Sequence, residues 1–233
     1  MNNHSPTPAK LPTADDIVGL HDRLLGVAGW PAAPAPMLPG VHPVWIWVET
    51  NHRYNSLLWA EEDLARRTTV AAEAIAANKR AIDGYNQARN DATERVDELL
   101  LVALGLVDPA SARTDAPVST VPAGARLNSE TAGSMADRLS ILALKVHAMG
   151  VQAGRTDVDE AHRDASRARL ARLQQQRADL AGCLDELLAD ALTGRAYFKV
   201  YRQFKMYNDA RFNPVLVAER AASGTSNDGS RPR

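Results

Sequence analysis

The chain has 233 residues, with 27 Lys and Arg against 28 Asp and Glu, one cysteine, and only 5% aromatic residues. A charged fraction of 24% is typical of globular domains and excludes a wholly disordered chain. The single cysteine excludes an intramolecular disulfide, and the net charge of −1 argues against a nucleic-acid partner. Since no run of 18 apolar residues occurs and the N-terminus has no apolar core, we expect a cytoplasmic protein without a membrane segment.

Both ends of the chain have the composition of disordered tails. Residues 1–13 combine three prolines with small polar residues, and residues 218–233 contain no large apolar residue beyond alanine. Such segments bury too little surface to offset the entropy lost on ordering. We therefore expect one helical domain over residues 14–217, which opens with a short helix over residues 15–27.

Four long helical patterns follow a proline-rich connection, and strand signals are almost absent. Glycine and proline mark the ends of most of these helices, which are predicted over residues 44–67, 71–104, 134–151 and 158–192. Helices of this length predict an all-α protein, specifically a four-helix bundle.

Residues 197–212 hold six of the eight Tyr and Phe residues of the chain, interleaved with Lys and Arg. Such a pattern can stack the bases of single-stranded nucleic acid. The near-neutral charge of the chain favours the other interpretation, an aromatic-rich C-terminal cap on the open end of the bundle.

The first long helix carries an unusual stripe of polar and aromatic residues beside its apolar face. A helical wheel places these seven on one line: Trp45, Val48, His52, Asn55, Trp59, Glu62 and Arg66. The wheel assigns Ile46 and Leu64 to the core, and Glu49 and Ser56 to the solvent. A bundle interface normally carries leucine at such stripe positions, and a buried polar group without a partner costs about 1–3 kcal/mol. The stripe therefore requires polar partners or a ligand.

The second and third long helices show the same anomaly. Asn78 and Arg89 fall within the apolar arc of the second helix, with Asn86 and Asn90 beside them. On the third helix three polar residues lie on one line between two apolar arcs, namely Ser134, Arg138 and Lys145. Two cations so placed should face an acid such as Glu62 or an anionic ligand.

The start of the third helix has two interpretations. Residues 128–134 (NSETAGS) form a small polar turn at a helix N-terminus, where free N–H groups and the helix dipole favour an anion. Ser134 and Asp137 also have the spacing of a capping box, which satisfies those N–H groups without a ligand.

We expect no metal and no cofactor. Two acid–histidine pairs have the spacing found in di-metal bundles, Glu49 with His52 and Asp159 with His162, but neither has a suitable setting. No glycine-rich phosphate loop is present. Cys183 lies between leucines in the fourth helix, which predicts a buried structural thiol.

Four segments resemble the bacterial family catalogued as domain of unknown function 4254. These are residues 52–67 (HRYNSLLWAEEDLARR), 79–91 (KRAIDGYNQARND), 128–142 (NSETAGSMADRLSIL) and 201–209 (YRQFKMYND). The resemblance implies a bacterial, cytoplasmic protein associated with the biosynthesis of surface glycans or specialised metabolites. It implies no catalytic residues. The family pattern often has histidine after the tryptophan, where this chain has Ala60.

Together these patterns predict a polar pocket that binds a small anionic metabolite bearing a phosphate or carboxylate. Glu62 and His52 are the candidate acid/base pair of a biosynthetic enzyme, a transferase or lyase. Nine further residues are candidates for substrate binding: Asn55, Trp59, Arg66, Asn86, Arg89, Asn90, Ser134, Arg138 and Lys145. The alternative is a non-catalytic scaffold whose buried polar residues set helix register and assembly. Either function is compatible with the homo-oligomer that we expect.

Overall fold

The computed structural model describes residues 10–36, 41–203 and 211–225, and confirms an all-α protein. The helices are α1 (Ala14–Leu25), α2 (Val44–Ala65), α3 (Ala72–Ala103), α4 (Ala132–Ala153), α5 (Glu160–Leu192) and α6 (Pro214–Thr225). The short helix and the four long helices therefore lie within a few residues of their predicted bounds. No helix among these residues is both long and apolar enough to cross a membrane.

The chain divides into two compact units, residues 1–200 and 201–233. The first unit contains α1 to α5 and the whole hydrophobic core. The second contains α6, which is helical over residues that include part of the expected C-terminal tail. The proposed aromatic cap stays a prediction, because residues 204–210 lie outside the described part of the chain.

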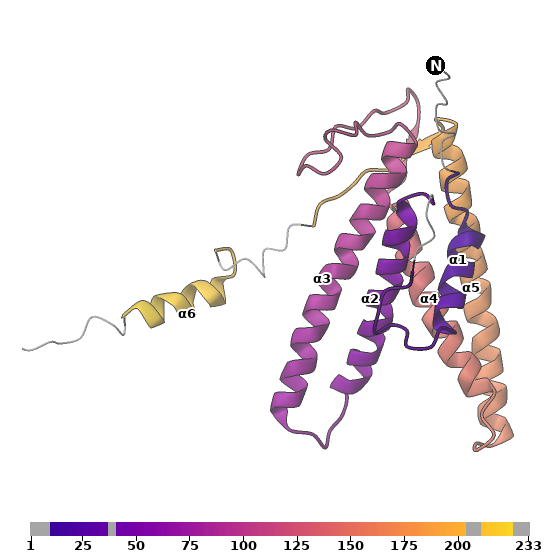
Figure 1. Ribbon diagram of the computed structural model, residues 1–233, viewed down its shortest axis with the longest axis vertical. Helices are drawn as coiled ribbons and strands as arrows, with labels where there is room; N and C mark the ends of the chain where they lie inside the picture. Colours follow the sequence, from indigo (N-terminus) through magenta and orange to yellow (C-terminus); the bar gives the residue numbers. More distant parts are fainter. Residues whose placement is uncertain (1–9, 37–40, 204–210, 226–233) are drawn as a thin grey trace, which may run out of the picture. The chain divides into compact units, whose positions relative to one another are not determined.

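In the first unit, α2 pairs with α3 and α4 pairs with α5, as two helical hairpins (Figure 1). The helix α4 is central, because it contacts α1, α2 and α3 as well as α5. The short α1 packs on α4, α5 and α2. Its Thr13 and Asp16 form a capping box, which fixes where this helix begins.

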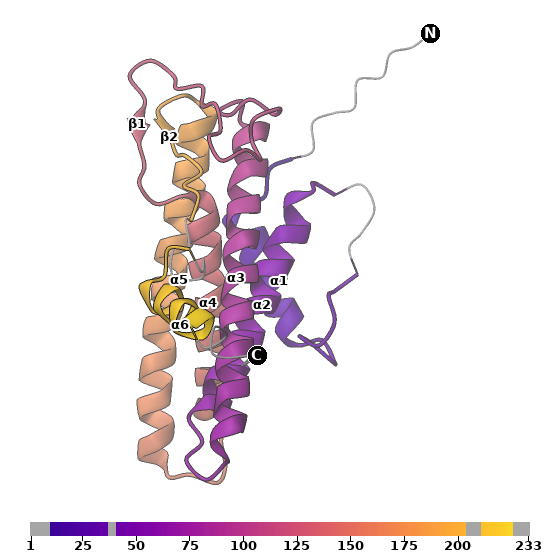
Figure 2. The same cartoon turned by 90° about the vertical axis from the view of Figure 1, so that its left-hand side faces the viewer.

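A long crossover connects α3 to α4 and contains the first of two short strands. The strand β1 (Arg126–Leu127) pairs in parallel with β2 (Ala196–Tyr197), which follows α5 (Figure 2). Phe198, next to β2, is 1% exposed and belongs to the core with Leu100, Leu139 and Leu184. The segment after α5 is therefore part of the packed unit as far as Val200, which packs partly buried against that core.

The wheel assigned four residues of α2 to the wrong environment. Ile46 and Leu64, which were expected in the core, are 47% and 40% exposed. Glu49 and Ser56, which were expected in solvent, are buried. The cause is the connection after α1: the backbone N–H of Ala35 donates to Glu49, and Trp30 Nε1 donates to Ser56 Oγ.

Candidate functional site

A cluster of five polar side chains lies inside the first unit, where α2 and α4 meet. We call Asn51, His52, Asn55, Asp137 and Ser140 the polar cluster. Asn51 and Asn55 each donate through Nδ2 to Asp137 Oδ1 at 2.8 Å. Asn55 Nδ2 also lies 3.0 Å from Ser140 Oγ, and Asn51 Nδ2 lies 3.0 Å from the hydroxyl of Thr93 on α3. The polar stripe of α2 thus finds protein partners on both neighbouring helices.

His52 is the member of this cluster that lies next to α1, and it has no exposed surface. Its Nδ1 is 2.8 Å from Ser140 Oγ, and its ring stacks on His21 of α1, with centroids 4.4 Å apart, and on Trp30. Burial lowers the pKa of His52 to about 4, against the opposing effect of the His21 backbone carbonyl. The imidazole is therefore neutral at pH 7, the form that a base requires, but it has no exposed surface, and its role as a catalytic base stays a prediction.

His21 is completely buried as well, and neither of its ring nitrogens has a hydrogen-bond partner among the described residues. Burial lowers the pKa of His21 well below its usual value, and the neighbouring His52 and Arg177 lower it further. Ser140 and His52 have the spacing of a nucleophile and its base, yet both are fully buried. We therefore assign this pair a structural role.

A cleft of about 390 Å³ opens beside the polar cluster, between α2, α3 and α4. We call it the α2–α3–α4 cleft. Six of the eleven residues that the sequence singled out line it: Asn55, Trp59, Glu62, Arg66, Asn86 and Arg89. The remainder of its wall includes Asp63 and three apolar side chains, Leu58, Ile141 and Leu144. The structure thus brings predicted residues of α2 and α3 into one concave site, to which α4 adds Ile141 and Leu144.

Glu62 lies at the exposed end of this cleft and does not pair with His52. Ten residues of α2 separate them, which corresponds to about 15 Å along the helix axis. Arg66 lies 3.5 Å from Glu62 and 3.9 Å from Asp63, so the partner of Glu62 is on its own helix rather than Arg138 or Lys145. Glu62 thus lines the cleft apart from His52, and the acid/base pair stays a prediction.

Arg89 occupies the inner end of the cleft, and its side chain is 25% exposed. Its Nη2 donates to Asn90 Oδ1 at 3.1 Å, which explains why Asn90 lies beside the cleft rather than within its lining. Its Nε is buried, 3.9 Å from Asp137 Oδ1, and has no hydrogen-bond partner among the described residues. The guanidinium thus keeps an unused donor that faces the polar cluster.

At the start of α4 the protein itself supplies acceptors for two backbone N–H groups, those of Gly133 and Ser134. Thr131 is the N-cap and accepts a hydrogen bond from the backbone N–H of Ser134. The carboxylate of Asp97 accepts the backbone N–H of Gly133 at 2.6 Å. Burial raises the pKa of Asp97 to about 7, although hydrogen bonds from Thr131 and Gly133 oppose this change. Thr131 is thus the N-cap in place of the predicted Ser134, and the anion site at this terminus stays a prediction.

Arg138 and Lys145 line a second concavity, the α4–α5 groove, of about 690 Å³. Arg138 pairs with Glu130 at 2.5 Å. The two cations thus lie apart from Glu62 and Arg89, and Ile141 forms part of both walls. Cys183 also lines this groove and is exposed, which corrects its prediction as a buried thiol, because it faces away from the leucines around it in sequence.

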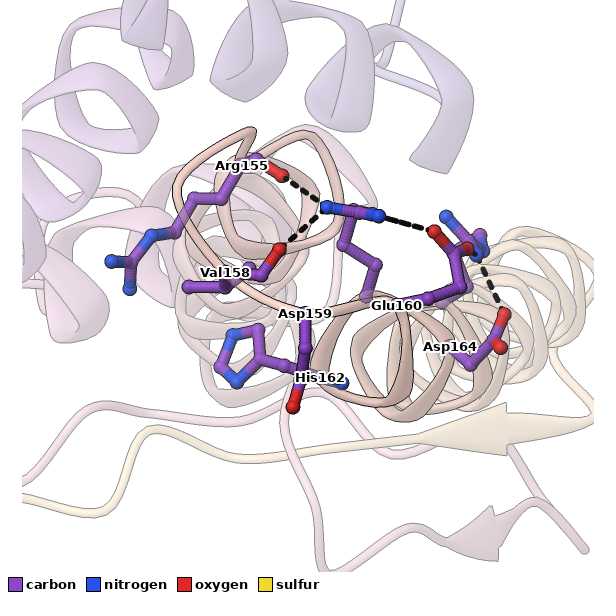
Figure 3. Close-up of polar contacts among 8 residues, drawn as sticks. Arg155, Val158, Asp159, Glu160, His162 and Asp164 are labelled. Carbon is purple, nitrogen blue, oxygen red and sulfur yellow. Dashed lines mark hydrogen bonds and ion pairs between the residues drawn. The ribbon is translucent and has the colours of Figure 1, made fainter.

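The two acid–histidine pairs have structural roles. Asp159 is the N-cap of α5 and accepts the backbone N–H of His162 at 2.8 Å, within a network of arginine contacts at the α4–α5 turn (Figure 3). His162 Nε2 lies 3.1 Å from the side-chain oxygen of Gln152. Glu49 binds the backbone of Ala35, as described above. Over residues 10–36, 41–203 and 211–225, no three His, Cys, Asp or Glu side chains form a metal-binding group.

Four polar residues around this site escaped prediction: the buried Asn51, Asp97 and Ser140, and the partly exposed Asp137. Asn51 precedes Asn55 by one helical turn, a signal that the wheel could have used. Asp137 was expected only as part of a capping box with Ser134. Their partners lie 36 or more positions away in sequence, so no local pattern indicates them.

A comparison with known families agrees with the resemblance noted in the sequence. The family model described as "Protein of unknown function (DUF4254)" matches residues 45–200, which include α2 to α5 and the whole lining of the α2–α3–α4 cleft. No curated protein and no solved structure matches the chain. Because the match extends over more than half of its residues, the chain belongs to the DUF4254 family.

Proposed function

We propose that this protein binds a small anionic metabolite in the α2–α3–α4 cleft, with Arg89 as the principal anion-binding residue. The observation that supports this proposal is the position of Arg89, whose side chain lines the cleft, is 25% exposed and lies 3.9 Å from Asp137 Oδ1, beyond hydrogen-bond distance. A carboxylate or phosphate oxygen in the cleft would gain a charge-assisted hydrogen bond to the exposed part of this guanidinium.

The other side chains of the cleft suit a small polar molecule. Asn55 and Asn86 offer amide groups, and Trp59 offers an aromatic surface beside them. Small-molecule sites commonly combine an apolar wall with a few convergent polar groups, as this cleft does. If the bound metabolite is converted, Glu62 and Asp63 are the carboxylates available for proton transfer.

The biological setting belongs to the same proposal. We propose the setting that the sequence resemblance implies, the biosynthesis of surface glycans or specialised metabolites in a bacterial cytoplasm, and an activity as a transferase or lyase. We also propose that α2 to α5 act as one four-helix bundle, which the contacts of α4 with both hairpins support. We propose in addition the aromatic-rich C-terminal cap that the sequence predicts over residues 197–212, and a homo-oligomeric state.

A direct test follows the Nε–H signal of Arg89 by ¹⁵N NMR. Replacing Arg89 by lysine removes and thereby assigns this signal, and Arg80→Lys, an exposed change on α3, assigns a control. Acetate and inorganic phosphate are then titrated at constant ionic strength against chloride. We expect both probes to shift the Arg89 signal while that of Arg80 stays unchanged. A chloride-like response of Arg89 throughout the millimolar range would contradict the proposal.

A second candidate function is a non-catalytic scaffold, because the polar cluster satisfies most of its groups within the protein. Buried polar contacts of this kind can set the register of packed helices. Asp137→Leu removes the shared acceptor of Asn51 and Asn55. If the scaffold role is the main one, light scattering should show a changed assembly state for Asp137→Leu, whereas Arg89→Lys should assemble normally.

A further inference from the structure

The α2–α3–α4 cleft has opposite electrostatic character at its two ends. At the outer end, the carboxylates of Glu62 and Asp63 share one guanidinium, that of Arg66, at 3.5 and 3.9 Å. Two acids against one base leave a surplus negative charge. The side chain of Asp63 is 69% exposed, so part of this charge can accept a further cation.

The inner end has the opposite preference. Although Asp137 lies near Arg89, its Oδ1 already accepts two amide hydrogen bonds, from Asn51 and Asn55. The distance of 3.9 Å between this oxygen and Arg89 Nε exceeds that of a hydrogen bond. Arg89 is therefore charge-compensated but retains a free donor. One such guanidinium suits a single carboxylate better than a multiply charged diphosphate.

The wall between the two ends is mainly apolar. It contains Leu58, Trp59, Ile141 and Leu144. A ligand that contacts both ends must therefore present hydrocarbon to this wall, because a polar group placed there would lose its water without gaining a partner.

The helix geometry gives the separation of the two ends. The contact between Asn51 and Thr93 sets the register of the α2–α3 hairpin, so that Arg89 lies at the level of Asn55. Glu62 follows Asn55 by seven residues, which corresponds to about 10 Å along the axis of α2. Long side chains at both ends shorten the gap that a ligand has to span.

We propose that the ligand of this cleft is bipolar: an amino acid whose carboxylate and ammonium group are separated by a short aliphatic chain. The carboxylate binds Arg89, the chain lies on the apolar wall, and the ammonium group lies between Glu62 and Asp63. This inference rests on the proposed function, since both place an anion at Arg89. It adds the cationic end and the length of the ligand.

Calorimetry at low ionic strength with 6-aminohexanoate, hexanoate and hexylamine tests this inference. The ammonium group meets an exposed acidic pair, so we expect 6-aminohexanoate to bind about fivefold more tightly than hexanoate. Hexylamine lacks the carboxylate, so we expect 6-aminohexanoate to bind at least about tenfold more tightly than hexylamine. Glycine is too short to span the cleft, so its affinity should gain nothing from carrying both charges.

Variants assign each charge to its end of the cleft. The double variant Glu62→Gln with Asp63→Asn removes both outer acids. Its affinity for 6-aminohexanoate should fall to its affinity for hexanoate, and its affinity for hexanoate should equal that of wild type. Arg89→Gln should weaken the binding of both carboxylate ligands, 6-aminohexanoate and hexanoate, about tenfold. The exposed changes Glu73→Gln and Arg80→Gln on α3 are the matched controls and should alter neither affinity. Circular dichroism of each variant verifies its folding, and Arg89→Lys, which keeps the charge, replaces Arg89→Gln if the latter unfolds.

The possible outcomes separate the two proposals. If hexanoate binds through Arg89 as tightly as 6-aminohexanoate, the bipolar ligand is refuted and the anion site remains. If hexylamine equals 6-aminohexanoate, the carboxylate has no role and the bipolar ligand is again refuted. If neither hexanoate nor inorganic phosphate binds, the anion site fails together with the inference.

Discussion

At the scale of single residues, the start of α4 shows how closely two helices approach. A Cβ atom built on Gly133 would lie 2.5 Å from the carbonyl oxygen of Thr93 and 2.9 Å from Asp97. Glycine is therefore required here by space, since the backbone of α3 has no flexible atom to move aside. The same close approach lets the Gly133 N–H reach the Asp97 carboxylate.

Replacing Gly133 by alanine should therefore destabilise the protein by about 1–3 kcal/mol, as expected for overpacking. Gly150→Ala is the matched control on the same helix, because a Cβ there meets nothing within 4 Å. It should stabilise the protein by up to about 1 kcal/mol through helix propensity. Urea unfolding of both variants measures the difference. Equal stability of Gly133→Ala and wild type would mean that the helices lie further apart.

The buried carboxyl of Asp97 predicts a pH dependence of stability. Its pKa is raised to about 7 in the fold, so its contribution is complete at acid pH and is lost as the pH rises through 7. Asp97→Asn can still accept the Gly133 N–H but does not ionise. Between about pH 5 and pH 8 the free energy of unfolding of wild type should fall relative to this variant, by about 3 kcal/mol. Asp91→Asn, an exposed change on the same helix, should show the same pH dependence of the free energy of unfolding as wild type.

At the scale of elements, α1 and the connection after it cover the polar cluster. His21 stacks on His52 from one side, and Trp30 stacks on the same ring. These two residues precede the segment that matches the family model, so the cover of His52 comes from outside that segment. Ion pairing of Arg177 with Asp22 and a hydrogen bond from the Ala14 N–H to Asp185 attach α1 to α5.

The stacked histidines should make the docking of α1 sensitive to acid. The pKa values of His21 and His52 are both lowered, so their contribution to stability is complete above their unfolded value of about 6.5. It is lost as the pH falls toward 4, because protonation would place two charges in a buried stack. The protection factors of the α1 amides in hydrogen exchange, which correct for the intrinsic effect of pH, should therefore fall between about pH 7 and pH 5.

A matched pair of variants tests the origin of this acid sensitivity. His21→Leu removes one titrating ring from the buried stack. It should reduce the loss of protection that the α1 amides show as the pH falls. His147→Gln changes an exposed histidine of α4 and should leave it unchanged. Identical pH profiles for wild type and His21→Leu would show that the histidine stack does not govern how α1 docks.

At the scale of the whole molecule, the packed unit ends at Val200, and none of residues 201–203 and 211–225 belongs to its core. A chain that stops after Gln203 should therefore unfold at the same urea concentration as the full chain. A chain that stops after Arg195 also loses β2 and the buried Phe198, and should be less stable by about 3–5 kcal/mol. Equal loss in both truncations would mean that residues 204–233 help to hold the first unit together.

The sequence by itself determined the helices, because apolar periodicity and the Gly, Pro and Thr signals at helix ends act locally. It also indicated that α2 carries polar residues requiring partners, and Asn55 and His52 are indeed buried. Six residues chosen from separate helical wheels line one cleft. A wheel can identify such residues because burial on a helix follows the same period as the helix itself.

Only the tertiary structure decided which partner each polar residue has. Glu49 is buried because a distant connection covers it, and the N-terminus of α4 is closed because Asp97 arrives from α3. Both contacts join segments whose relative position depends on the packing of the whole unit, to which no local pattern is sensitive. For the same reason His52 and Glu62, which share one stripe in sequence, have separate environments: one lies beneath α1, the other at the open end of a cleft.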